Sequence, residues 1–455
     1  MAEANRLLMI SLAISIITVI LIAASFLSLS SRIADLNERL TQIEDRISGI
    51  EDALEGLPAT TPTPEATPVA EVEEAITLVR LTVIGPWSGV EQEYFLKVIE
   101  EYQRANPGVE IRYVPMRPED VARTAAIQFE AGIAPADVII TPWAWWIVEM
   151  ARKGHVVDVT DLVNRDEYVP GIVENVEYDG KIWGVPFTMW LKPGFWYKKS
   201  FFEENGLEEP ETWEEFVALL ETISGIDGIT APIVSGNGVG WPLSDVAEHF
   251  IITFAGAEAQ LGLISGERSF TDPDVREAME RLVSLIEAGY FGEPIEWTAG
   301  VEKWWNEEYA LYFMGTWITG MVEDPNDLGF FTLPGAKGVV GGADYAFIPK
   351  YAENVEEAMR FLEYLATEGQ AVHVSTPAGK VPTWLGVGID QLWPPMQVVF
   401  QKIKEQGLSI LPDLDDSIGG DWQTLFWDQL KLLWVQPDRL GEVLATLTEQ
   451  HPVAG

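Results

Sequence analysis

Tryptophan is the side chain whose placement in this sequence points most clearly to binding chemistry. The chain has 18 tryptophans and no cysteine. Several stand beside glycine or proline in segments typical of loop tips, namely Trp87 in GPWSG, Trp143 and Trp145 in TPWAW, Trp241 in GWP and Trp317 in GTW. An indole offers a flat apolar face and one N–H donor, which suits the C–H face of a sugar ring. These loop-tip tryptophans indicate a ligand site, whereas we expect most of the others to be core residues.

The other side chains capable of chemistry do not form a catalytic or metal-binding pattern. The absence of cysteine excludes thiolate sites, and His155, His249, His373 and His451 lie too far apart in the sequence to form a known ligand motif. Residues 413–421, DLDDSIGGD, depart from a calcium loop, so we interpret them as an acidic turn, with a cation site as the alternative. A formal charge of −42 makes nucleic acid an unfavourable partner. We therefore predict no enzyme, no cofactor and no bound metal.

The N-terminal segment is predicted to hold the protein in a membrane. Leu7–Ser31 is an uncharged apolar run, about 38 Å long as a helix, which is enough to cross a bilayer. A cleaved signal peptide is the alternative, but the run is long for one and lacks a clear cleavage site. We expect residues 1–31 to be a single-pass anchor in the cell membrane, with the remainder of the chain outside the cell.

A heptad repeat follows the apolar run directly. Aliphatic residues alternate at spacings of three and four, at Ile33, Leu36, Leu40, Ile43, Ile47, Ile50, Leu54 and Leu57. This pattern predicts a parallel coiled coil over residues 32–57. Two Arg-to-Glu pairs, Arg39 with Glu44 and Arg46 with Glu51, stand in hexapeptides that resemble those of short trimeric coiled coils. The expectation is a homotrimer, with a dimer as the alternative.

Residues 58–76 are rich in threonine and proline and are predicted to be an extended linker. From residue 77 onward, short apolar runs alternate with amphipathic helical stretches: ITLVRLTVI, YFLKVIEEYQRAN, VEIRYVPM, PADVIIT and WIVEMARKG. Alternating strands and helices predict an α/β domain with a largely parallel sheet. In such sheets ligands bind beyond the carboxyl ends of strands, where the Trp87 and Trp143 segments stand.

The globular part resembles the extracellular solute-binding proteins of ABC importers, in the maltose-binding-like group. The resemblance covers residues 77 to about 440 and rests on the order of several segments, including FEAGIAPADVIITPWAWWIVEMARKGHVVDVTDL, YDGKIWGVPF, ALYFMGTWITG and GGADYAFIPKYAENVEEAMRFLEYLATEGQ. It implies the two-lobed type II fold of periplasmic binding proteins, with ligand in the cleft. By resemblance, lobe one is about 77–187 plus 318–380 and lobe two about 188–317 plus 381–450, within a domain of 77–455.

The resemblance also implies which residues contact the ligand. The residues that match its ligand-contacting stretches are Trp87, Ser88, Gln92, Thr141, Trp143, Trp145, Trp190, Asn237, Trp241, Asp245, Gly315, Trp317, Gly342, Asp344 and Trp384. Trp213, Trp427 and Trp434 are expected in the core, and one of Trp304 and Trp305 at the cleft. The implied function is capture of a sugar for delivery to ABC permease subunits. The alternatives are another ligand, such as a peptide or polyol, and a structural or adhesive trimeric surface protein with an idle cleft.

Overall fold

The computed structural model describes residues 78–237 and 240–453 of the chain. The expected membrane anchor (1–31), the coiled coil with its heptad and charge-pair residues (32–57) and the linker (58–76) all lie outside these residues. No helix in the two described ranges has both the length and the hydropathy that crossing a bilayer requires.

The first half of this part alternates strands and helices as predicted. Its elements are β1 (Val79–Gly85), α2 (Val90–Ala105), β2 (Val109–Pro115), α3 (Pro118–Glu130), β3 (Val138–Thr141) and α4 (Ala144–Arg152). Helix α2 buries Phe95, Val98, Ile99 and Tyr102, whose spacing of three and four residues forms one apolar stripe. The helix ends just before Pro107, which is unfavourable in a helix interior. The expected strand–helix order is confirmed here.

The large sheet is mixed rather than largely parallel, which corrects the sequence-based expectation. Its order is β14 (Val381–Pro382), β6 (Val185–Lys192), β13 (Gly338–Phe347), β3, β1 and β2, with β15 (Ser409–Pro412) also paired to β13. Strands β1, β2 and β3 pair in parallel, but β13 pairs antiparallel to both β3 and β6. Strand β13 follows β6 only after residues 193–337, so no short strand–helix–strand connection sets its direction.

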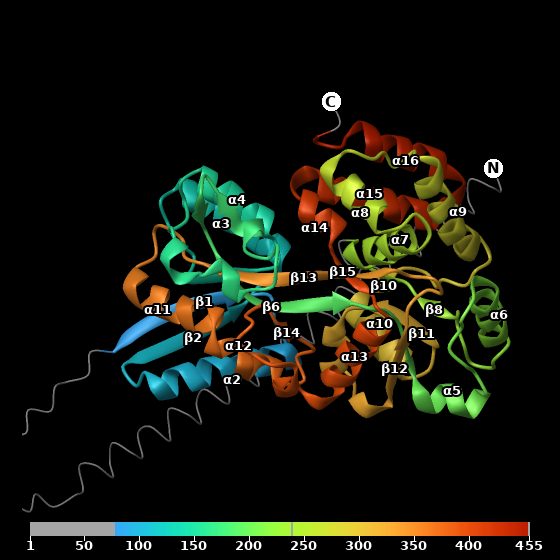
Figure 1. Ribbon diagram of the computed structural model, residues 1–455, viewed down its shortest axis with the longest axis horizontal. Helices are drawn as coiled ribbons and strands as arrows, with labels where there is room; N and C mark the ends of the chain where they lie inside the picture. The colour runs from blue at the N-terminus through green and yellow to red at the C-terminus, as the bar shows by residue number, and fades with distance from the viewer. Residues whose placement is uncertain (1–77, 238–239, 454–455) are drawn as a thin grey trace, which may run out of the picture. The chain divides into compact units, whose positions relative to one another are not determined.

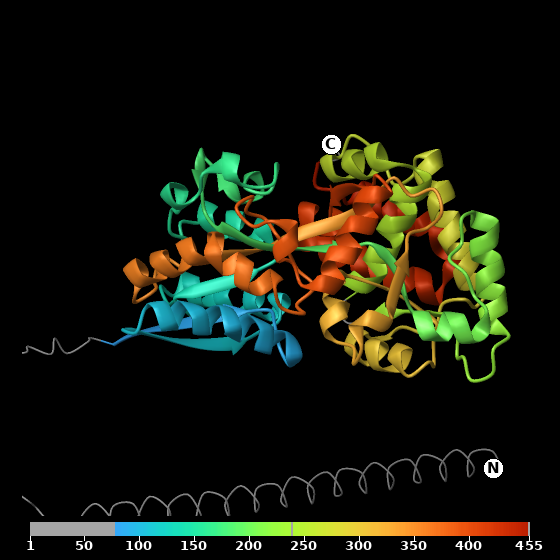
Figure 2. The ribbon, with the colours of Figure 1, turned by 60° about the horizontal axis from the view of Figure 1, so that its bottom comes forward.

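A second sheet stands in the other half of the described chain. It contains β12 (Leu328–Phe331), β7 (Gly194–Lys198), β11 (Leu311–Met314) and β8 (Ile233–Val234), in that order. Strand β7 follows β6 after Pro193 and begins at Gly194, whose φ is +148° and where a Cβ would lie 2.1 Å from the Phe331 carbonyl oxygen. Only glycine allows the chain to pass between the two sheets there. Figures 1 and 2 show the resulting two-lobed α/β fold, with β6 and β13 between the lobes.

Helices cover the second sheet and line its border with the first. They are α5 (Lys199–Asn205), α6 (Trp213–Ser224), α7 (Trp241–Phe254), α8 (Ala257–Ser265), α9 (Pro273–Glu287), α10 (Trp297–Trp305), α13 (Pro394–Glu405), α14 (Leu414–Ile418), α15 (Gly420–Val435) and α16 (Leu440–Glu449). Helix α7 packs against α9, α15 and β11. On the first sheet, α11 (Val355–Ala366) packs against β6, and α12 (Glu368–Val374) packs against α2.

Strand β12 lies in a stretch expected to belong to lobe one, yet it pairs with β7 in the second sheet. Its four residues, LGFF, are all buried, and antiparallel pairing to β7 satisfies their backbone groups. The first strand after residue 317 to enter the large sheet is β13, which spans Gly338–Phe347. The chain therefore returns toward the first sheet through β13, about twenty residues after Trp317.

Candidate functional site

A pocket lined with tryptophan lies where the two halves of the described chain meet. Its cavity measures about 220 Å³, which is room for many waters and therefore for a solute larger than a single ion. Seven indoles line it: Trp87, Trp143, Trp190, Trp241, Trp297, Trp317 and Trp427. Five of these belong to the set predicted from sequence, and the structure brings them together with Ser88 and Asp344 of that set. The geometry suits a flat solute with apolar faces.

Two of the predicted site residues, Gly315 and Gly342, have no side chain and so leave space for neighbouring indole rings. A Cβ on Gly315 would lie 2.0 Å from the Trp317 ring, and a Cβ on Gly342 would lie 2.4 Å from the Trp190 ring. Neither glycine lines the pocket itself. Because each indole lies flat on a glycine backbone, its ring is fixed against the wall of the pocket. The two rings then meet edge to face, with centroids 6.0 Å apart.

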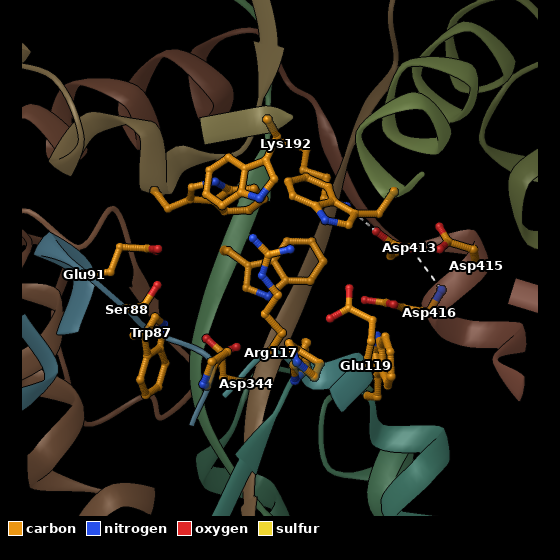
Figure 3. Close-up of a pocket in the computed structure, with 18 of the residues that line it drawn as sticks. Trp87, Ser88, Glu91, Arg117, Glu119, Lys192, Asp344, Asp413, Asp415 and Asp416 are labelled. Atoms are coloured by element: carbon orange, nitrogen blue, oxygen red, sulfur yellow. Dashed lines mark hydrogen bonds and ion pairs between the residues drawn. The ribbon is translucent and has the colours of Figure 1, made fainter. Parts of the chain in front are cut away.

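The first wall of the pocket follows β1. The Trp87 backbone N–H donates to the Tyr113 hydroxyl at 3.0 Å, and that hydroxyl donates to the Trp87 carbonyl oxygen at 2.9 Å. The Trp87 ring packs on Phe95 of α2, with ring centroids 4.5 Å apart. Ser88 and Glu91 follow at the start of α2 and come from the same side of the cavity (Figure 3). The loop conformation is thus held by a tyrosine on the neighbouring strand β2.

The second wall follows β3, where Thr141 and Trp145 support Trp143. The Thr141 hydroxyl accepts a hydrogen bond from the Trp143 N–H at 3.2 Å, and the Trp145 ring stacks on Trp143 with centroids 5.6 Å apart. Trp145 also covers Gly419, where a Cβ would lie 2.3 Å from its ring. Trp143 reaches Trp427 of α15, with centroids 6.3 Å apart. Thr141 and Trp145 lie behind the lining and position a residue that belongs to it.

A buried ion cluster forms the third wall. Lys192, at the end of β6, donates to Asp245 of α7 and, at 2.6 Å, to Asp413 before α14. Burial raises the pKa of Asp245 to about 7 even though Lys192 opposes this shift. Burial disfavours the charge of Lys192, but Asp245 and Asp413 outweigh it and hold the lysine pKa well above its usual value. Asp245 itself is fully buried and lies outside the pocket lining.

The carboxylates of Asp245, Glu248 and Asp413 lie within 4.8 Å of one another, as do those of Asp413, Asp415 and Asp416. Either group has the oxygen ligands that a cation requires. The Lys192 ammonium already supplies positive charge to the first group. Asp413 also accepts a hydrogen bond from the Asp416 N–H at 3.1 Å, and so caps α14. Residues 413–421, expected to be an acidic turn, instead form helix α14 with Asp413 as its N-cap, followed by the first residues of α15.

On the opposite side, Asp344 of β13 is buried and accepts a hydrogen bond from Lys380 at 2.8 Å. Burial raises the pKa of Asp344, against the opposing effect of Lys380. Glu91 is half-buried nearby, and burial raises its pKa to about 7, with Lys380 opposing and Asp344 adding to the shift. The Lys380 ammonium also lies 5.7 Å from the centre of the Trp87 ring.

The remaining predicted residues stand away from the lining. Gln92 is half-buried on α2. Asn237 lies in β9 (Gly236–Asn237), paired with β10 (Ile295–Glu296). Trp384 donates from Nε1 to Glu167 at 3.4 Å, and its backbone forms a bridge with Tyr168. None of the three lines the pocket.

Several lining residues were not anticipated. Trp427 and Trp434 are both buried in the core as expected, but Trp427 also lines the pocket and donates from Nε1 to Asp415 at 2.5 Å. Trp304 is buried and Trp305 lies outside the lining, whereas Trp297 at the start of the same helix α10 lines the pocket. Apart from Pro86, Pro118 and Pro142, the other unanticipated side chains are charged or hydroxylic: Glu91, Arg117, Glu119, Lys192, Thr298, Lys380, Asp413, Asp415 and Asp416. Arg117 and Glu119 stand where β2 ends and α3 begins, and this position at the carboxyl end of a strand was the signal that could have identified them as pocket residues.

Comparison with known proteins assigns these features to a family. The sequence profile described as "Bacterial extracellular solute-binding protein" matches residues 87–372. An uncharacterized ABC transporter extracellular-binding protein of Pyrococcus horikoshii is 54% identical over 394 residues, which are 86% of this chain and 92% of that protein. An alpha-glucosides-binding periplasmic protein of Rhizobium meliloti is 32% identical over 212 residues, covering 44% of this chain and 45% of its own length.

Solved structures agree on the fold. A maltotriose-binding protein of Thermus thermophilus, bound with maltotriose, superimposes with a TM-score of 0.65 at 20% identity, covering 81% of this chain and 98% of its own. A chitin oligosaccharide binding protein gives a TM-score of 0.68 at 22% identity, covering 83% of this chain and 100% of its own. At these identities the likeness establishes the two-lobed α/β fold.

Proposed function

This chain belongs to the bacterial extracellular solute-binding proteins of ABC transporters, and we propose that it captures a sugar or oligosaccharide and delivers it to a permease. Members of this family are non-enzymatic transport components. The observation that carries the proposal is the convergence of seven indoles on one pocket whose wall also holds carboxylates and lysines. Indoles stack on the C–H faces of sugar rings, while carboxylates accept hydrogen bonds from hydroxyls.

Binding is proposed to shift the population of two lobe arrangements. We keep the division into lobe one (about 77–187 plus 318–380) and lobe two (about 188–317 plus 381–450) as a proposal, with β12 placed beside β7 by its pairing. A solute that contacts both lobes favours the closed arrangement by the contacts it gains there. The pocket draws Trp87 and Trp143 from one side and Trp241 and Trp427 from the other, so a solute between them touches both.

The ligand-contacting set within the proposal consists of the predicted residues that line the pocket and those that support them. The lining members are Trp87, Ser88, Trp143, Trp190, Trp241, Trp317 and Asp344, and the supporting members are Thr141, Trp145, Asp245, Gly315 and Gly342. Gln92, Asn237 and Trp384 stay in the proposal as residues that a larger oligosaccharide would reach. Surface anchoring through residues 1–31 and trimerisation through residues 32–57 also remain proposals from the sequence.

The test is a thermal-shift panel of monosaccharides and oligosaccharides on the full chain, followed by calorimetric titration of any stabilising sugar. We expect at least one sugar to raise the unfolding temperature and the Trp317→Ala variant to weaken its binding by tenfold or more. Trp183→Ala is the matched control, because the Trp183 Nε1 donates to the Tyr178 carbonyl oxygen and lies outside the pocket. If no sugar, peptide or polyol stabilises the protein, the structural or adhesive alternative is favoured instead.

A further inference from the structure

The pocket lining is strongly acidic. Six of its side chains are carboxylates and three are cations: Glu91, Glu119, Asp344, Asp413, Asp415 and Asp416 against Arg117, Lys192 and Lys380. A carboxylate accepts hydrogen bonds and donates none while it is ionised. The wall therefore offers many more acceptors than free donors, and its complement is a solute rich in donors.

The three cations are already paired. Lys380 donates to Asp344, and both side chains are almost fully buried. Lys192 is shared between Asp245 and Asp413. The Arg117 guanidinium lies 3.7 Å from the Glu296 carboxylate. Within residues 78–237 and 240–453, no lysine or arginine forms an ion pair with Glu91 or Glu119.

Four of the six lining carboxylates form no ion pair with a lysine or arginine among the described residues. Asp415 and Asp416 accept hydrogen bonds from Trp427 and Gln423 instead, which leaves Glu91 and Glu119. The Glu119 Oε2 atom is buried and has no hydrogen-bond partner among the described residues. Burial raises the pKa of Glu119, with Arg117 opposing, just as it raises that of Glu91. Figure 3 shows both side chains turned toward the cavity from α2 and α3. An unpaired carboxylate in such a site is destabilising until a proton or a cation neutralises it.

The pocket also holds two examples of an ammonium group on an indole face. The Lys192 Nζ lies 4.6 Å from the centre of the Trp190 ring and 5.8 Å from that of Trp241. The Lys380 Nζ lies 5.7 Å from the centre of the Trp87 ring. An indole face attracts a cation, and more strongly where water is excluded. Four lining indoles, Trp143, Trp297, Trp317 and Trp427, have no such lysine or arginine over them among the described residues.

We propose that the solute carries a protonated amine, as an amino sugar does, and that Glu119 binds this ammonium group beside the free indoles, while Glu91 adds negative charge on the opposite side of the cavity (Figure 3). This inference rests on the proposed function and specifies the class of sugar. A neutral sugar fills the same apolar space but leaves the two carboxylates uncompensated when the site is desolvated. A divalent metal ion fits less well, because it requires several oxygen ligands and gains little from indole faces.

The experiment compares isosteric pairs by calorimetric titration of the full chain at pH 7 and low ionic strength. The pairs are glucose with glucosamine, galactose with galactosamine, and cellobiose with its 2,2′-diamino counterpart, in which an ammonium group replaces a hydroxyl. The expected result is that the amino member of at least one pair binds tenfold tighter or more. We expect the Glu119→Gln variant to reduce that ratio to threefold or less, and Glu91→Gln to reduce it partly.

Glu110→Gln is the matched control, because Glu110 is exposed on β2 and pairs with Arg80 away from the pocket. It should keep the full preference for the amine. Equal or tighter binding of every neutral member overturns the inference and leaves the proposed function standing. A preference that persists unchanged in both pocket variants also overturns it. If no member of any pair and no other sugar binds, the proposed function fails and the inference fails with it.

Discussion

Lys192 is the residue on which the charged wall of the pocket depends most. It is buried, as are Asp245 and Asp413, and its ammonium group is bonded to both carboxylates. Removing one member of a buried ion pair leaves an uncompensated charge, which is strongly destabilising. We expect Lys192→Met to lower the free energy of unfolding at pH 7 by about 3–5 kcal/mol in urea titration.

The control for this substitution is Lys303→Met, whose ion pair with Glu308 is partly solvent-exposed, unlike the buried pairs of Lys192. Exposed pairs contribute little to stability, so this variant should unfold near the wild-type midpoint. If the two substitutions had equal effects, the claim that the wall depends on Lys192 would be wrong.

Glu91 gives the pocket a specific pH dependence. Its pKa is raised by burial from 4.5 to about 7, so between these values the folded state holds a proton that the unfolded chain has released. The contribution of Glu91 to stability is therefore fully present below pH 4.5 and is lost as the pH rises through about 7. Glu91→Gln keeps the size of the side chain and cannot ionise. We expect this variant to gain stability relative to wild type over that range, by at most about 1.4 kcal/mol per pH unit.

Denaturant titrations of both proteins at half-unit pH steps measure this difference. It should level off above pH 7.5. A difference that stays constant from pH 4 to pH 8 would mean that Glu91 ionises alike in the folded and unfolded states.

At the residue scale, the sequence predicted the indoles of the pocket better than its charges. Trp87, Trp143, Trp241 and Trp317 stand beside glycine or proline, and this local signal marks the ends of strands and the starts of helices that border the pocket. Lys192 has no comparable signal, because its partner Asp413 lies 221 positions further along the chain. Because the sequence has 71 acidic residues, the partners of a given lysine are identified only once the fold brings them together.

At the element scale, helix α14 is held against α4 by a close glycine contact. Gly419 has a φ of +70° and a ψ of −166°, and a Cβ there would lie 2.3 Å from the Trp145 ring. That backbone region is essentially restricted to glycine. We expect Gly419→Ala to destabilise the protein by roughly 1–3 kcal/mol and to speed hydrogen exchange at the amides of α14.

Gly420→Ala separates backbone strain from the clash with the indole. Gly420 also has a positive φ, of +60°, but nothing lies within 4 Å of a Cβ built there. We expect Gly420→Ala to leave hydrogen exchange at the amides of α14 close to that of the wild-type protein. Equal exchange in the two variants would contradict a role for the Trp145 contact.

The element order was predictable where strand and helix are neighbours in sequence. The segments β1, α2, β2, β3 and α4 show clear apolar periodicity, and each formed near its expected position. The direction of β13 was not predictable in this way. Its antiparallel pairing with β3 and β6 joins residues more than 140 positions apart, which local periodicity does not encode. The place of β12 in the second sheet has the same origin.

At the scale of the whole molecule, the formal charge of −42 is the dominant property. So large a net charge destabilises the compact state through repulsion among its carboxylates. Added salt screens charges separated by more than about 10 Å at 0.1 M, while buried pairs such as Lys192 with Asp413 are screened much less. We therefore expect the unfolding temperature of the full chain to rise when sodium chloride is increased from 0.02 to 0.5 M.

The same screening should act in the opposite direction on an ammonium-bearing solute. Its attraction to an acidic pocket weakens with salt, so affinity should fall over the range in which stability rises, whereas a neutral sugar should bind with nearly constant affinity. Scanning calorimetry and titration at matched salt concentrations measure both trends on one preparation. A fall in unfolding temperature with salt would show that exposed ion pairs, such as Arg80 with Glu110, contribute more to stability than the repulsion removes. Local ion pairs, rather than long-range repulsion, would then dominate the effect of charge on the stability of the protein.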